Sequence, residues 1–453
     1  MFKKSKRTRI CYTVMSIVTA LLLLAACTST PASGPAATTA PAATTAPAAT
    51  TAPATTAPAG GGAQEPVTLN FWHAYGGRNG ELIDAFVERF NNAHENIEVV
   101  ATHQGSHHDV VTALQMAVAA NTQPDLSSKE RAFVEFFAMS DALLDLEPYI
   151  QAAGMNGFWN QSLMAHSYFN GITAAVPFAR STPIMHVNVS MLDEMGLAIP
   201  STWDDLWNVA NALVIKDGDD IVRSGLSFPY DTWYFLALMR QAGGSLINSA
   251  GTAFDDTDQL AQAFQFIRDL EDADALMYPP PGYGGDYVNQ LFAEERVGMI
   301  WQSTGSIGGL SNLVDFEYTT AFLPMNVMRS NPTGGANIVI LAGTDHPDES
   351  WTFIEWIMKD PEGLVVFIAE SGFLPASAHF VDSPLIQNLW ATTPMFRIAY
   401  EQLQFAEDTN ITVFWPEVMA EMFRTIEAIM YDHDDIATEV ARFQRETNFI
   451  LGQ

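Results

Sequence analysis

Cysteine is nearly absent from this 453-residue chain, which has only Cys11 and Cys27. Both lie close to the start, so no disulfide can cross-link residues 28–453 internally. Disulfides stabilise mainly small secreted domains that cannot build a sufficient core. The stability of this chain must therefore come from side-chain packing, for which a hydrophobic content of 48% provides ample material.

Basic residues are also scarce, with 21 Lys and Arg against 52 Asp and Glu and a formal net charge of −31. A nucleic-acid-binding protein needs a basic surface, which this composition excludes on any large scale. An acidic surface also repels anionic lipid head groups. We therefore expect neither nucleic acid nor a lipid surface as a direct partner of the folded part, and interpret the charge as a device for solubility.

Motifs for catalysis and metal binding are missing as well. The chain contains no HExxH and no CxxC, and Gly76–Gly80 lacks the Lys-Ser/Thr pair of a phosphate-binding loop. The adjacent histidines His107 and His108 diverge on either a strand or a helix, which disfavours a shared metal. Acidic pairs are too frequent here to indicate glycoside chemistry. We expect no catalytic residue, no metal and no other cofactor.

The start of the chain has the layout of a secretion signal. Five basic residues lie within the first nine positions, and an apolar run from Val14 to Leu24 follows. That run is shorter than the ~20 residues that a membrane-spanning helix needs. The sequence Leu24-Ala25-Ala26-Cys27 resembles the bacterial lipobox, which implies removal of residues 1–26 and lipidation of Cys27. We expect an extracytoplasmic protein held by lipid at the outer face of the cell membrane, on the periplasmic side.

Residues 27–66 comprise Cys27 and a low-complexity segment rich in Ala, Thr and Pro. This segment has no apolar periodicity from which a packed structure could form. Thr and Pro favour extended backbone, so the segment could reach roughly 100 Å at ~3.1 Å per residue. We interpret it as a tether between the membrane and the folded part.

Residues 67–453 alternate strand and helix patterns. Val67, Leu69 and Phe71 alternate as in a strand, a helical face follows over 82–90, and 97–100 indicates the next strand. Asp109 is predicted to cap a helix over the following residues. This order favours an α/β fold with a largely parallel sheet, and the length suits two lobes.

Further along, the sequence is richer in helix signals. Thr202 precedes Trp203-Asp204-Asp205, which predicts a hydroxyl cap and acidic residues at the positive end of a helix. Thr257 or Asp258 is predicted to cap a helix with one apolar face. After Asp348, apolar residues again repeat at helical spacing.

Several segments, in their order along residues 67–453, resemble the extracellular sugar-binding proteins that supply ABC importers (solute-binding family 1). They are Asn70-Phe71-Trp72-His73, Val176-Pro177-Phe178-Ala179-Arg180-Ser181-Thr182-Pro183, Pro200–Leu206, Gly298-Met299, Ser303-Thr304-Gly305-Ser306, Gly334-Gly335-Ala336-Asn337 and Ser371-Gly372-Phe373-Leu374-Pro375. Within the family the chain is most similar to the glycerol-3-phosphate-binding branch.

The resemblance implies an α/β, two-lobed periplasmic-binding-protein-like fold with a hinge and a ligand cleft between the lobes. It implies that residues 67–180 and 338–385 form lobe 1, and that 181–337 and 386–453 form lobe 2. It further implies a non-enzymatic receptor, a monomer, whose partners are a small solute and the subunits of an ABC permease.

The resemblance also suggests ligand-binding positions, and the aromatic and polar residues beside them add further candidates. At one position the alignment leaves Glu130 and Arg131 open. Trp233 and Trp301 are each balanced between platform and core, and His73 is more often structural than ligating. The candidates are His73, Tyr75, His107, Arg131, Arg180, Ser181, Trp233, Trp301, Ser303, Ser306, Gly335, Phe373 and Trp415.

One departure from the branch bears on the ligand. The late segment in which the branch has an arginine for phosphate reads Asn410–Pro416 here and contains none. Trp415 in this segment instead offers an apolar face that suits a sugar ring. Arg131 or Arg180 could replace the missing charge. The sequence favours a neutral sugar or oligosaccharide over glycerol 3-phosphate; a surface glycoside hydrolase and a sensor subunit are the alternatives of other classes.

Overall fold

The computed structural model describes residues 66–169, 171–407 and 411–452. These residues belong to one compact unit, Ala63–Gln453. The expected signal segment, Cys27 and nearly all of the expected tether lie outside the described residues.

The first of two five-stranded sheets has the strand order β2-β1-β3-β13-β6. Its strands are β1 (Val67–His73), β2 (Ile97–His103), β3 (Leu126–Glu130), β6 (Val176–Ser181) and β13 (Gly334–Ile340). The strands β1, β2 and β3 run parallel, as the alternating strand and helix patterns predicted. The late strand β13 is antiparallel to both of its neighbours, β3 and β6, so it joins the early part of the sheet to β6.

The second sheet has the order β11-β7-β10-β9-β8. Its strands are β7 (Pro183–Asn188), β8 (Ile215–Asp217), β9 (Asp220–Ser227), β10 (Val297–Ser303) and β11 (Tyr318–Ala321). Only β9 and β10 run parallel; the other pairs are antiparallel. Two short pairs, β4 (Tyr168–Phe169) with β5 (Ile172–Thr173) and β12 (Asn331–Pro332) with β14 (Ala406–Glu407), lie apart from these sheets.

The chain passes from the first sheet to the second at Thr182, the one residue between β6 and β7. Thr182 is fully buried, and both of its oxygens are used. Its carbonyl accepts the N–H of Thr304 at 3.0 Å, and its hydroxyl accepts the side chain of Gln402 at 3.0 Å. The crossing is therefore anchored by residues that follow it by more than a hundred positions.

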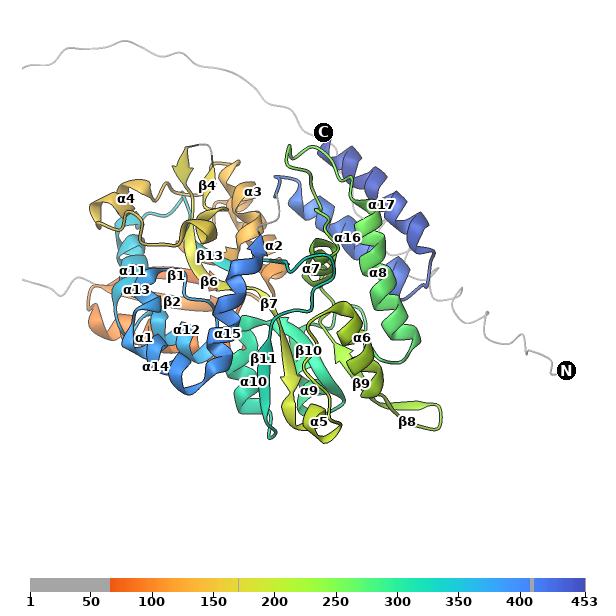
Figure 1. Cartoon of the computed structure of the whole chain (residues 1–453). Coiled ribbons are helices and arrows are strands. Elements are labelled where there is room, and N and C mark those ends of the chain that lie inside the picture. Colours follow the sequence, from red (N-terminus) through yellow and green to blue (C-terminus); the bar gives the residue numbers. More distant parts are fainter. Residues whose placement is uncertain (1–65, 170, 408–410, 453) are drawn as a thin grey trace, which may run out of the picture. The chain divides into compact units, whose positions relative to one another are not determined.

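Helices cover both sheets (Figure 1). They are α1 (Gly77–Ala93), α2 (His107–Ala120), α3 (Val134–Ala138), α4 (Glu147–Ala152), α5 (Val189–Glu194), α6 (Trp203–Ala212), α7 (Thr232–Gln241), α8 (Thr257–Asp272), α9 (Gly285–Ala293), α10 (Ile307–Leu313), α11 (Pro347–Lys359), α12 (Leu364–Ser371), α13 (Ala378–Val381), α14 (Pro384–Thr392), α15 (Pro394–Glu401), α16 (Trp415–Met430) and α17 (Ile436–Leu451).

The caps explain where several of these helices begin. Thr202 caps α6 and forms a capping box with Asp205, as predicted. The predicted cap of α2 was wrong by one turn: Ser106 is the cap, and Asp109 is its capping-box partner three residues into the helix. For α8 the helix begins one position earlier than expected, after Asp256, whose side chain makes no capping bond.

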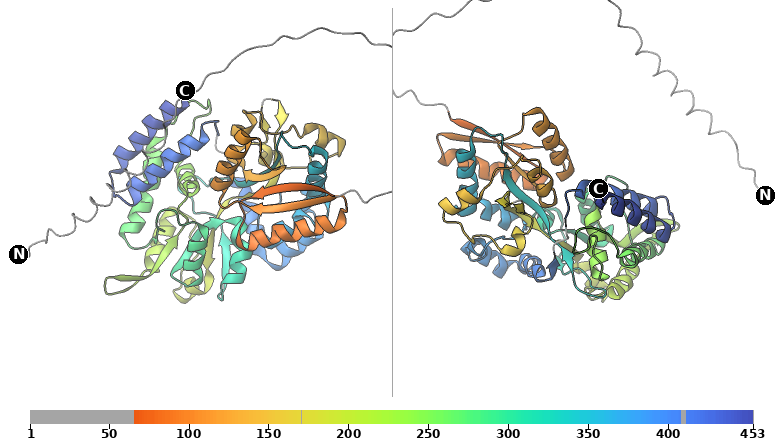
Figure 2. Two further views of the ribbon diagram at one scale, coloured as in Figure 1. Left: turned by 180° about the vertical axis from the view of Figure 1, so that it is seen from behind. Right: turned by 90° about the horizontal axis from the view of Figure 1, so that it is seen from above.

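Two large cores hold the fold together. One packs α1, α11 and α12 against the first sheet around Phe71, Phe86 and Phe353. The other packs the second sheet with α6, α7, α8, α16 and α17. Figure 2 shows α16 and α17 beside α8 from both directions. The helices α16 and α17 come from the end of the chain, so the second-sheet side is completed by residues far from its first strand.

Candidate functional site

A cleft of about 1090 Å³ lies between residues of the first-sheet side and residues of the second-sheet side. Ten of the thirteen predicted ligand positions line it: Tyr75, His107, Arg131, Ser181, Trp233, Ser303, Ser306, Gly335, Phe373 and Trp415. Residues that are more than three hundred positions apart in the chain thus surround one space. We predict that these residues contact the solute.

One side of the cleft, the polar wall, consists of Tyr75, His107, Glu130 and Arg131. Tyr75 follows β1 and is only 6% exposed, and within the described residues its hydroxyl has no hydrogen-bond partner. The His107 ring packs edge-on against it, 5.4 Å between centroids. Burial raises the pKa of Tyr75 and lowers that of His107 to about 4. Both side chains are therefore neutral near pH 7 and add no charge to this wall.

Glu130 and Arg131, between which the sequence did not decide, both reach the cleft at the end of β3. The carboxylate of Glu130 accepts the N–H of Ala132 at 2.9 Å. Burial raises the pKa of Glu130, while the neighbouring Arg131 opposes that rise. Arg131 donates through Nη2 to the carbonyl of Thr333 at 2.6 Å. A hydrogen-bond acceptor, Glu130, and a hydrogen-bond donor, Arg131, thus lie side by side on the polar wall.

The opposite side, the aromatic wall, consists of Tyr230, Trp233, Trp415 and Phe423. Asp231 caps α7 by accepting the N–H of Trp233 at 2.9 Å, which sets the direction of that indole. A Cβ added at Gly334 would lie 2.4 Å from Trp233. Only glycine therefore allows the indole to lie so close to the crossing segment before β13.

Ser303, Ser306, Gly335 and Phe373 occupy the part of the cleft near the crossing strands. The hydroxyl of Ser303 accepts the N–H of Gly305 at 3.2 Å and so shapes the turn after β10. Gly335 has φ of +83°, and a Cβ there would lie 1.9 Å from the carbonyl oxygen of Ala179. Phe373 stacks on Phe367 at 5.4 Å and faces Gly305 from the first-sheet side. These residues bring the two sides of the cleft into contact.

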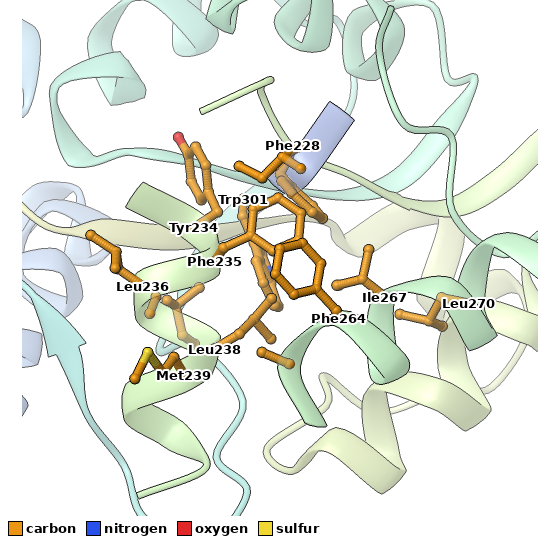
Figure 3. Packing of buried hydrophobic residues seen from close by; sticks show 14 of the residues in the cluster. Phe228, Tyr234, Phe235, Leu236, Leu238, Met239, Phe264, Ile267, Leu270 and Trp301 are labelled. Carbon is orange, nitrogen blue, oxygen red and sulfur yellow. The ribbon is translucent and has the colours of Figure 1, made fainter. Parts of the chain in front are cut away.

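Three predicted positions, His73, Arg180 and Trp301, do not line the cleft. His73 is on the same face of β1 as Leu69 and Phe71 and is buried between His103 and Tyr75. Trp301 is fully buried on β10 and stacks on Phe228 (Figure 3). The position of His73 follows from strand alternation, which places every second residue on the same face. Trp301 lies on a strand whose first six residues are all buried.

Arg180 is fully buried, does not line the cleft, and donates hydrogen bonds to groups in the interior. Its guanidinium donates to the carbonyls of Gly334 and Leu163, at 3.0 and 2.8 Å. It also donates to the side chains of Asn337 and Thr333. The arginine thus ties β6 to β13 and to the segment before it, and we no longer count it among candidate solute contacts.

Sequence reasoning missed several lining residues, including Tyr230, Phe423 and Glu427. A signal was present in α16, where Trp415, Met419, Phe423 and Glu427 recur at every fourth position. Residues at that spacing share one face of a helix. Once Trp415 is taken as a site residue, the stripe extends the site along the helix for three more turns.

The fold and the cleft together define a class of receptor. The family model of the bacterial extracellular solute-binding proteins matches residues 85–394, and the chain belongs to this family. Its members are non-enzymatic receptors, which sets aside the glycoside hydrolase considered above. The resemblance stated from the sequence is confirmed.

Particular relatives are more distant. The maltotriose-binding protein of Pyrococcus abyssi is 24% identical over 391 residues, covering 83% of this chain and 80% of the relative. The sn-glycerol-3-phosphate-binding periplasmic protein of Pectobacterium atrosepticum is 21% identical over 368 residues, covering 76% of this chain and 80% of the relative.

Solved structures confirm the predicted fold class. UgpB of Mycobacterium tuberculosis, in complex with glycerophosphocholine, matches with a TM-score of 0.76 at 22% identity, covering 86% of this chain and 98% of that one. The GacH receptor of Streptomyces glaucescens, solved with and without acarbose, gives 0.77 at 19% identity, covering 86% and 99%.

Within the described ranges, no helix is both long and apolar enough to cross a membrane. The same ranges contain no group of three or more His, Cys, Asp or Glu side chains arranged to hold a metal ion.

Proposed function

We propose that this protein is the substrate-binding component of an ABC importer that captures a sugar, an oligosaccharide or a related polyol and delivers it to the membrane permease. The observation that carries the proposal is the cleft, in which the polar wall faces the aromatic wall. Aromatic faces suit the C–H faces of sugar rings, and neutral hydroxyl and imidazole groups suit their hydroxyls. The maltotriose-binding relative supports a sugar.

Closure of the two sides around the solute is part of this proposal. The bounds expected from the sequence are 67–180 and 338–385 for lobe 1, and 181–337 and 386–453 for lobe 2. The exchange of sheets at Thr182 supports the first crossing. Because β13 pairs within the first sheet from Gly334 onward, we move the second crossing from 337/338 to just before Gly334. Contacts made only in the closed form would shift the equilibrium toward it.

The alternative ligand is glycerol 3-phosphate or one of its diesters, which the second group of relatives supports. The charges favour the sugar over a phosphate monoester. Among the described lining residues, the carboxylates of Glu130, Asp231, Asp286 and Glu427 outnumber the guanidiniums of Arg131 and Arg424. A buried phosphate needs charge-assisted donors, which Arg supplies best.

Titration distinguishes these ligands. Maltotriose, sn-glycerol 3-phosphate and glycerophosphocholine are added in turn while tryptophan fluorescence and the melting temperature are followed. A bound solute at 100 times its Kd adds ~2.7 kcal/mol to the free energy of unfolding. A response to none of these, nor to a wider carbohydrate panel, would argue against the proposal. Affinity that falls steeply with salt would favour the phosphate ester.

We also propose that the receptor is anchored by lipid on Cys27 after removal of residues 1–26, with residues 28–66 as a tether. A tether keeps a receptor close to its permease and raises its effective concentration there. Replacing Cys27 by serine should release the mature protein from the membrane fraction, and mass spectrometry of the wild-type N-terminal peptide should show attached acyl chains. Unchanged fractionation of the variant would contradict the anchor.

A further inference from the structure

One corner of the cleft is formed by Tyr230, Phe423 and Glu427. None of these residues was expected at the site, and Tyr230 and Phe423 also belong to the aromatic wall. Tyr230 lies just before α7, whereas Phe423 and Glu427 lie four residues apart on one face of α16. We call these three residues the Glu427 corner.

The three side chains form a connected group. The ring centroids of Tyr230 and Phe423 are 5.2 Å apart. The Tyr230 hydroxyl donates to Glu427 Oε1 at 2.8 Å. Burial of the phenol, together with this bond, raises the pKa of Tyr230, so the hydroxyl remains a donor at all ordinary pH values. The carboxylate is thereby fixed beside two aromatic rings, with its second oxygen not engaged by the phenol.

The side chain of Glu427 is solvent-exposed and carries its charge without a basic partner in the described structure. Within the part of the chain that the structure describes, Glu427 forms no ion pair. The nearest basic residue on its helix is Arg424, whose Nη1 instead donates to Glu421 at 2.5 Å. Glu421 is also paired with Arg442 at 3.0 Å. The basic residues Arg424 and Arg442 are therefore paired with Glu421, which lies six residues before Glu427 on α16.

A fixed carboxylate beside aromatic faces suits an alkylammonium group. The faces of aromatic rings, including those of Tyr and Phe, carry negative partial charge and bind alkylammonium groups. A carboxylate adds a full negative charge, which would repel an anion. A neutral sugar could also stack on Tyr230 or Phe423 and donate a hydroxyl to the carboxylate, but it would not gain from the full negative charge as a cation does.

We propose that the Glu427 corner is a subsite for an alkylammonium group carried by the solute. This inference rests on the proposed function, because it treats the cleft as the site of solute capture. It narrows the solute to one that combines a polyol or sugar part with a cationic nitrogen, and it makes Glu427 a specificity-determining residue.

The test uses the full-length mature protein and a matched pair of small probes. Choline and 3,3-dimethyl-1-butanol have nearly the same shape, but only choline is charged. Calorimetric or NMR titration should show choline binding about tenfold tighter than the alcohol, a difference of about 1.4 kcal/mol. In Glu427→Gln, which keeps the acceptor for Tyr230, choline should lose that advantage while affinity for the alcohol stays unchanged.

Two further variants serve as controls. Phe423→Leu should reduce the choline preference severalfold without altering the carboxylate. Arg424→Gln removes the nearby positive charge without touching Glu427 and should leave the preference intact or raise it. Melting temperatures of all variants show whether the fold is retained.

Equal binding of choline and its neutral isostere, or no binding of either, would overturn the subsite. Wild-type affinity for choline that Glu427→Gln leaves unchanged would overturn it as well. Maltotriose and glycerophosphocholine are titrated in the same series. If they bind while the choline preference is absent, the subsite fails and the receptor function stands; if no solute binds at all, the receptor function fails first.

Discussion

The two walls of the cleft differ in how they are built. The polar wall presents few atoms, held by burial at the ends of β1 and β3, and its hydroxyl and imidazole are neutral. The aromatic wall presents large ring faces along α16 and at the start of α7. Oriented polar atoms fix the orientation of a bound ligand, whereas ring faces provide contact area. We therefore expect the polar wall to select solutes and the aromatic wall to supply most of the affinity.

The largest effect should come from the arginine that supports the first sheet. Arg180→Met removes donors to four buried acceptors and should lower the free energy of unfolding by about 3–5 kcal/mol. Denaturant unfolding measures this loss. The control is the exposed Arg397, which forms an ion pair with Glu401 on the same helix. Arg397→Met should cost no more than about 0.5 kcal/mol. Similar losses for both variants would contradict a structural role for Arg180.

The second-largest effect is expected at two tryptophans, one of which should affect solute affinity and the other stability. Trp233→Ala should weaken solute binding by about 2–3 kcal/mol, roughly 30- to 150-fold, with a smaller change in melting temperature. Trp301→Phe should do the opposite, because Trp301 packs in the core and does not reach the cleft. Titration and melting of both variants provide the comparison. An affinity loss in Trp301→Phe that matches the loss in Trp233→Ala would break the assignment of the aromatic wall.

An acid-sensitive contribution is expected from His73, beside the polar wall. Burial lowers its pKa from 6.5 to about 4, with a smaller effect from His103. The unfolded chain therefore binds more protons between these values, and stability falls as the pH drops from 6.5 toward 4. At pH 5 the loss from this group is about 2 kcal/mol relative to pH 7.

Unfolding of His73→Gln at both pH values checks this contribution. The pH-dependent loss should be smaller in the variant by that amount. His107 and His186 shift in the same direction and remain in both proteins, so they do not affect the difference. Identical pH dependence in variant and wild type would show that His73 titrates normally.

The smallest effect should come from the hydroxyl of Tyr75. Because this hydroxyl has no partner in the described structure, Tyr75→Phe should leave stability nearly unchanged. Solute binding should weaken by about 1 kcal/mol, roughly fivefold, if the hydroxyl bonds to the solute. The exposed Tyr283, outside the cleft, is the matched control. Unchanged affinity in Tyr75→Phe would show that the Tyr75 hydroxyl does not bind the solute.

Much of the fold could be predicted from the sequence because local patterns and packing agree. Strand alternation over 67–71 and the Thr202 cap both appear as expected. The antiparallel place of β13 had no local signal, because it depends on contacts with strands that lie far away in the chain. The ligand-binding positions were predicted from the resemblance to a family and not from a catalytic or metal-binding motif.

Within the site, the errors have a physical cause. Arg180 was taken as a candidate because it lies in the crossing segment and could replace the missing charge for a phosphate. In the structure its guanidinium is buried, and four acceptors compensate for that burial. The four-residue spacing along α16 was visible but uninterpretable until α16 was known to face α7. Which side of a helix meets a cleft is decided by tertiary packing, which the periodicity alone does not reveal.

The central position of β13 has a consequence for how the molecule is made. In the first sheet, β6 is hydrogen-bonded to the rest only through β13, which begins at residue 334. An emerging chain that has delivered β1, β2, β3 and β6 therefore holds an unfinished sheet with two unpaired edges. Such edges invite aggregation, and long-range pairings form slowly. For a chain that crosses the membrane from its N-terminus, we expect these edges to need protection until roughly three quarters of it has emerged.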